Sequence, residues 1–109
     1  MTGHFQFPTI PLSGIGTRSG RYLISIFKVI LSFEPEQGKY IKSYPIHESQ
    51  VILADNQQEL RIKLTIFITH DLVMEILLYG MSVRVISPEH LVKKIKAIYT
   101  GANALYART

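Results

Sequence analysis

The 109-residue chain contains no Cys and no Trp, 47% of its residues are hydrophobic, and its formal net charge is +4. The absence of Cys excludes disulfide frameworks, thiolate zinc sites and cysteine nucleophiles, and the hydrophobic content excludes wholesale disorder. No apolar run reaches the ~20 residues of a spanning helix, and the N-terminus lacks the pattern of a signal peptide. We therefore expect one globular domain in the cytoplasm, without membrane contact.

The positive charge is concentrated near the C-terminus. Residues 1–80 contain seven Lys or Arg and seven Asp or Glu, whereas residues 81–109 contain five basic residues against Glu89 alone. Three of these five fall on the outer side of a predicted terminal helix, where lysines ordinarily keep a helix soluble: Lys93, Lys94 and Lys96. A charge of +4 is modest beside that of a dedicated nucleic-acid-binding domain, so charge by itself identifies no partner.

The first twenty residues differ from the rest of the chain. Pro8, Pro11 and several glycines interrupt them, so no regular element of useful length fits. We interpret residues 1–20 as a linker or connector segment and residues 21–109 as the folded domain. This domain begins with a predicted strand over residues 22–33, whose β-branched and aromatic residues leave both faces apolar.

Hydrophobic periodicity and capping residues predict the remaining elements. Strict alternation makes residues 59–68 the clearest strand. Thr69 is a predicted N-cap and Gly80 a predicted stop for the helix between them. Ser87 is predicted to cap the terminal helix, with Pro88 at its first position. The full set comprises a helix over residues 34–44, strands over 50–54, 59–68 and 82–86, a helix over 70–79 and a helix from residue 88 onward.

This order of elements predicts an α+β protein. It matches the ferredoxin-like βαββαβ arrangement, an antiparallel sheet with both crossover helices on one face, with an additional C-terminal helix. Alternation then assigns these residues to the helix-covered face: Val29, Leu31, Phe33, Leu60, Ile62, Leu64, Ile66, Ile68, Val83 and Val85. The open face receives Lys28, Ile30, Arg61, Lys63, Thr65, Phe67, Arg84 and Ile86.

The four cations predicted on the open face allow two interpretations. They are suited to contact phosphates, as in sheet-face RNA-binding proteins, which makes a nucleotide or single-stranded nucleic acid the alternative ligand. Stacking of bases also requires aromatic residues, and Phe67 is the only one available there. We favour a half-solvated sheet, or a dimer interface in which the cations surround the apolar residues of that face.

The sequence lacks a recognisable catalytic or metal-ligating pattern. Its histidines are His4, His47, His70 and His90, and no two of them stand at ligand spacing. Asp55 and Asp71 occupy a predicted turn and a predicted helix start, which are structural uses of Asp. Ser49 lies near His47 and Glu48, but neighbours in a short segment do not by themselves order a nucleophile, a base and an orienting group. We expect no enzyme activity, no metal site and no cofactor.

Several segments carry a family pattern. Tyr44 to Gln50 reads YPIHESQ, residues 29–33 read VILSF, and residues 79–91 contain YG followed by VRVISPEHL. These segments resemble the proline, aliphatic, histidine, any residue, serine, glutamine signature, the VxLxF start and the VxVxxPExL motif of one domain. That domain is the C-terminal extension, of the WCX type, of WYL-domain transcriptional regulators. The resemblance covers residues 28–106, and its specificity lies in the order and spacing of the motifs.

The resemblance implies a part of a bacterial transcription regulator. Such regulators also contain an N-terminal winged helix-turn-helix that binds DNA and a WYL β-barrel that senses a nucleic-acid or nucleotide-like ligand. Neither is recognisable in this sequence, and residues 1–20 resemble the connector from the barrel to the extension. The family often dimerises through contacts that include the extension. We therefore expect a non-catalytic regulatory and dimerisation module that forms a homodimer and acts with the upstream WYL and winged-helix domains.

Four residues match the family's signature directly: Pro45, His47, Ser49 and Gln50. A Ser and a His that follow a Pro can hydrogen-bond the backbone and fix the corner between a helix and a strand, which is the role we favour. The functional alternative places them in a small polar ligand pocket.

Overall fold

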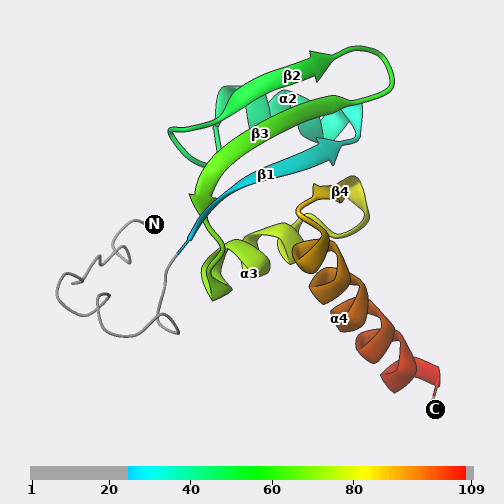
Figure 1. Ribbon diagram of the computed structural model, residues 1–109. Helices are drawn as coiled ribbons and strands as arrows, with labels where there is room; N and C mark the ends of the chain where they lie inside the picture. The colour runs from blue at the N-terminus through cyan, green and yellow to red at the C-terminus, as the bar shows by residue number, and fades with distance from the viewer. Residues whose placement is uncertain (1–24, 108–109) are drawn as a thin grey trace, which may run out of the picture.

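The computed structural model describes residues 25–107 (Figure 1). The predicted linker over residues 1–20 and the start of the predicted first strand lie outside the described residues. In chain order, the elements are β1 (Ile26–Phe33), α2 (Pro35–Ser43), β2 (Val51–Asp55), β3 (Leu60–Phe67), α3 (His70–Leu78), the 3-10 turn η3 (Gly80–Ser82), β4 (Val83–Ser87) and α4 (Glu89–Ala107).

The strands form one antiparallel sheet in the order β2-β3-β1-β4. The central pair, β1 and β3, is in register along its whole length, from Ile26 opposite Phe67 to Phe33 opposite Leu60. The connections β1–α2–β2 and β3–α3–β4 each cross over one strand through a helix, which is the ferredoxin-like arrangement. The predicted α+β class, the ferredoxin-like βαββαβ sheet and the additional C-terminal helix are therefore confirmed.

The core lies between the sheet and its helices, and alternating strand residues build one side of it. In β3, Leu60, Ile62 and Leu64 are at most 1% exposed, whereas Arg61 and Lys63 between them reach solvent. This alternation is the period of an extended strand, so the predicted division into a covered and an open face is observed. The rest of the buried core consists of Val29, Leu31, Phe33, Ile41, Leu72, Val73, Ile76, Val85, Leu91 and Ile95.

Local capping fixes the ends of α3. The hydroxyl of Thr69 accepts a hydrogen bond from the amide of Leu72 at 3.1 Å, which confirms Thr69 as the N-cap. At the other end, Gly80 adopts a φ of +58°, a left-handed conformation that glycine tolerates because it has no Cβ. The predicted stop is thus also confirmed.

The start of α4 differs from the prediction. Ser87 is the last residue of β4, where it pairs with Ile30 beside a register shift, and it does not cap the helix. The Ser87–Pro88 peptide bond is cis. The carbonyl of Pro88 accepts hydrogen bonds from the amides of Leu91 and Val92, each at 3.1 Å, so the helix begins at Glu89. Pairing with β1 extends β4 through Ser87, the residue that local capping preferences assign to the start of α4.

Candidate functional site

The predicted cations share the open face of the sheet. Ser32 in β1 pairs with Arg61 of β3 on one side and with Arg84 of β4 on the other. Ile30, two residues earlier and therefore on the same face, pairs with Lys63. Lys28 continues this row opposite Thr65. The structure therefore brings together Lys28, Arg61, Lys63 and Arg84.

A carboxylate lies among these cations. Glu59 Oε1 accepts a hydrogen bond from Ser32 Oγ at 2.6 Å and pairs with Arg61 Nε at 3.1 Å. The Ser32 hydrogen bond, assisted by Arg61 and Arg84, lowers the pKa of Glu59 below its ordinary value, although partial burial opposes this effect. Sequence reasoning missed Glu59 as a member of this face, because the contact with Ser32 depends on the pairing of β1 with β3.

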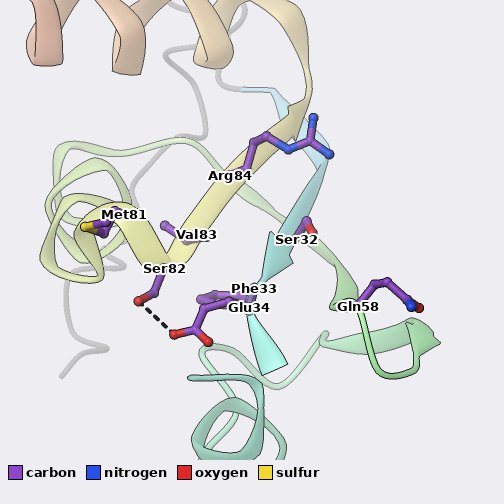
Figure 2. A pocket seen from close by; sticks show the side chains of 8 residues that line it. All are labelled: Ser32, Phe33, Glu34, Gln58, Met81, Ser82, Val83 and Arg84. Carbon is purple, nitrogen blue, oxygen red and sulfur yellow. Dashed lines mark hydrogen bonds between the residues drawn. The ribbon is translucent and has the colours of Figure 1, made fainter. Parts of the chain in front are cut away.

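A pocket of about 220 Å³ lies near η3, where β1 and β4 meet (Figure 2). Inside it, Ser82 Oγ donates to the carboxylate of Glu34 at 3.3 Å, so these two groups satisfy each other. Arg84 extends from β4 away from Met81, as Figure 2 shows. Arg84 is the one cation that lines this pocket, and it also belongs to the open face of the sheet.

A larger groove of about 400 Å³ lies between α3, β4 and α4. Its lining is mainly apolar and includes Ile76, Val85 and Ile95. Tyr99 also lines the groove, and its hydroxyl donates to the carbonyl of Gly80 at 3.3 Å. Lys96 and Arg84 are the charged lining residues, so the groove holds no acid–base pair.

The signature residues Pro45, His47, Ser49 and Gln50 lie in the connection between α2 and β2. His47 Nδ1 accepts a hydrogen bond from the Ser49 amide at 3.0 Å and lies 2.8 Å from Ser49 Oγ. Ser49 Oγ accepts in turn from the amide of Thr65 in β3, at 2.9 Å. Because β2 begins only at Val51, this hydroxyl serves a β3 amide beyond the end of the neighbouring strand.

Gln50 ties the same corner to the preceding helix. Its side-chain Nε2 donates to the carbonyl of Ile41, in α2, at 3.1 Å. Its Oε1 accepts from the amide of Ile46 at 2.9 Å. The polar atoms of the signature thus bond to backbone groups of the helix, the connection and the sheet.

Within residues 25–107, no group of three or more His, Cys, Asp or Glu side chains is placed to hold a metal ion. His90 packs its ring edge-on against Phe27, with the ring centroids 4.8 Å apart. Asp55 forms an ion pair with Lys42, with 3.0 Å between Oδ2 and Nζ. The same part of the chain contains no helix long and apolar enough to cross a membrane.

The WCX domain family matches residues 25–102, a range that contains the whole sheet, α2, α3 and most of α4. The chain belongs to the WCX domain family. This assignment confirms the resemblance drawn from the sequence motifs, and WCX domains are associated with the C-termini of WYL-domain regulators. No curated protein sequence matches the chain.

Both features described above lie inside the matched region of the WCX domain. The signature corner joins α2 to the sheet, and the cationic face lies on the side of the sheet opposite the core. The last residues of α4, from 103 to 107, extend beyond the match.

Proposed function

We propose that this chain is the C-terminal regulatory and dimerisation module of a WYL-domain bacterial transcription regulator, and that it is not an enzyme. The match to the WCX domain over residues 25–102 carries the proposal. We assign DNA recognition and effector sensing in that regulator to its winged-helix and WYL domains.

Exposed apolar side chains support the proposed role in protein–protein contacts. Val51, Ile52 and Leu53 in the edge strand β2 are 46–49% exposed. Met81, in η3, is fully exposed, and Leu78, the last residue of α3, is 78% exposed. Exposed apolar side chains that form a contiguous surface mark sites of protein–protein contact.

Size-exclusion chromatography with light scattering over a range of concentrations tests the dimerisation role. We expect the mass to approach twice the 12.4 kDa of one chain as concentration rises. A strict monomer at every concentration contradicts a self-sufficient dimer module. The DNA directly upstream of the Met1 codon tests the assignment to a regulator. We expect it to encode a winged helix and a WYL barrel in frame, and a promoter at that position would contradict the assignment.

A second function, binding of a nucleotide or single-stranded nucleic acid, is supported by the shared placement of four cations on the open face. Among the described residues, Lys28, Lys63 and Arg84 form no ion pair, and Arg61 pairs with Glu59. Phosphate contacts release counterions, so binding at this face is expected to weaken steeply with salt.

An Arg61→Ala, Lys63→Ala double variant tests this second function in a salt series with a short oligonucleotide. Lys39→Ala, Lys93→Ala is the matched control, because it removes the same charge from helical ion pairs away from the sheet face. We expect the first variant to lose affinity and salt dependence and the control to keep both. Equal binding by the parent and both variants contradicts binding at this face.

A further inference from the structure

Three hydrogen-bond donors stand in one row across the open face of the sheet. Ser32 in β1 lies between Arg61 of β3 and Arg84 of β4, because it pairs with both. Directly paired residues of neighbouring antiparallel strands share one side of the sheet, with their Cβ atoms about 5 Å apart. Figure 2 shows Ser32 and Arg84 on their two adjacent strands. A hydroxyl flanked by two guanidinium groups is a set of donors suited to an anion.

The anion bound by these donors in the structure is the protein's own Glu59. Its carboxylate accepts from Ser32 Oγ at 2.6 Å and pairs with Arg61 Nε at 3.1 Å. The charge of Arg84 also acts on this carboxylate and helps to lower the pKa of Glu59. The side chains of Glu59 and Arg61 are 23% and 35% exposed, less than those of any other ion pair in the part of the chain that the structure describes. The row of donors therefore already holds one anion at a half-buried position.

The four strands place no second carboxylate on this face. Asp55 is the only acidic residue within them, and it lies on the helix-covered side, where it pairs with Lys42 of α2. Glu34 follows β1, but its carboxylate accepts from the Ser82 hydroxyl and from an amide in the first turn of α2. Glu59 is thus the carboxylate that opposes the cations of the open face.

The backbone of Glu59 is fixed independently of its carboxylate. Its amide donates to Asn56 Oδ1 and its carbonyl accepts from the Asn56 amide, both at 3.0 Å. These bonds hold the turn between β2 and β3 whatever the side chain of Glu59 does. Rotation about the side-chain bonds of Glu59 therefore exposes Ser32 and Arg61 without moving the sheet.

A phosphate group uses the same donors as this carboxylate, because guanidinium and hydroxyl groups donate to the oxygens of both. While Glu59 is in place, Ser32 Oγ and Arg61 Nε are engaged with it. A phosphate that contacted Arg84 alone would then lie close to a like charge. An incoming phosphate gains the whole row of donors only by displacing the carboxylate.

We propose that Ser32, Arg61 and Arg84 form a phosphate site on the open face of the sheet, and that Glu59 is an internal competitor at this site. The proposal rests on the second function proposed above, binding of a nucleotide or single-stranded nucleic acid. It names the place where a phosphate of that ligand binds and the side chain that limits its affinity. Removing the negative charge of Glu59 therefore strengthens binding, whereas removing an acidic charge from the other side of the sheet does not.

Glu59→Gln tests the competition, because glutamine keeps the length of the side chain and removes its charge. Binding of a single-stranded oligothymidylate of about eight nucleotides is measured by fluorescence anisotropy. We expect Glu59→Gln to bind roughly tenfold more tightly than the parent, since the phosphate no longer has to displace a charged partner of Arg61. Asp55→Asn is the matched control, because it removes the same charge from an ion pair on the other side of the same sheet, and it is expected to bind like the parent.

A double-mutant cycle distinguishes competition from a change in net charge. In the parent, Glu59 neutralises Arg61, so Arg61→Ala is expected to weaken binding by about threefold or less. In the Glu59→Gln background the same substitution is expected to weaken binding roughly tenfold, because Arg61 then contacts the phosphate. Lys63→Ala is expected to have the same effect in both backgrounds, since Lys63 has no ion pair among the described residues. Circular dichroism of each variant checks that its fold is retained.

Thymidine 5′-monophosphate, titrated into the same variants, distinguishes the two sources of the phosphate group. Tighter binding of both probes by Glu59→Gln assigns the site to the phosphate of a single nucleotide. Tighter binding of the oligothymidylate alone assigns it to the phosphodiester backbone of a single strand.

The outcomes separate this proposal from the function on which it rests. Equal affinities of the parent and Glu59→Gln overturn the competitor role, as does an equal increase in Asp55→Asn or an Arg61→Ala effect that is the same in both backgrounds. Binding at the open face still stands in those cases if the Arg61→Ala, Lys63→Ala double variant binds more weakly than the parent. Absence of binding to both probes by the parent and by Glu59→Gln overturns the site and the function together.

Discussion

At Gly38, the close approach of α2 to the sheet leaves no room for a side chain. A Cβ at this position would lie 2.8 Å from the Cβ of the buried Leu60, closer than two such carbons can pack. Gly38→Ala is therefore expected to lower the free energy of unfolding by about 1–3 kcal/mol, measured by urea denaturation. Gly101→Ala is the control, because no atom lies within 4 Å of its added Cβ. Alanine favours helix there, so an equal loss at both positions would contradict the steric argument.

The carboxylate of Glu59 links the open face to acid stability. Its folded-state pKa is depressed, so its contribution to stability is present above the unfolded-state pKa and is lost as the pH falls through the folded-state pKa. Ser32→Ala removes the main cause of this depression, and we expect the pKa of Glu59 to rise and acid unfolding to begin at a higher pH. NMR titration of the Glu59 carboxyl measures the shift. Ser43→Ala, at the end of α2, is the control, and an unchanged pKa in Ser32→Ala would overturn the assigned cause.

For single helices and strands, the sequence predicts the features that depend on neighbouring residues alone. The alternation of β3 and the two ends of α3, Thr69 and Gly80, are observed as predicted. Ser87 was assigned wrongly because its capping chemistry is local, whereas its pairing with Ile30 joins residues far apart in the sequence. A local capping preference is overridden where pairing with a distant strand satisfies the same backbone groups.

The N-cap of α3 gives a prediction at this scale. Thr69→Ala removes the oxygen that accepts from the Leu72 amide, and we expect a loss of about 1 kcal/mol in the free energy of unfolding. Thr69→Ser keeps an equivalent hydroxyl and is expected to retain most of the stability. Thermal and urea unfolding of the two variants provide the comparison. Equal loss in both variants points to packing of the Thr methyl group and contradicts the capping argument.

For the molecule as a whole, strand alternation sufficed to predict the shared face of the four cations, because a period of two fixes the sides of a sheet. It did not predict the hydrogen bond from Thr65 to Ser49, since this contact depends on where β2 begins relative to β3. The periodicity of α4 predicted one amphipathic helix but not that its fully buried residues, Leu91 and Ile95, lie only in its first two turns. How much of a helix is buried depends on the other elements packed against it, so the periodicity of one helix does not predict it.

If the chain dimerises as proposed, its stability becomes a function of its concentration. For a dimer that unfolds to separate chains, each tenfold rise in concentration adds about 1.4 kcal/mol to the apparent stability. We expect the melting temperature and helical circular dichroism of the parent to rise with concentration. A melting temperature and a helical signal that stay constant over the whole range of concentration would contradict dimerisation of this chain.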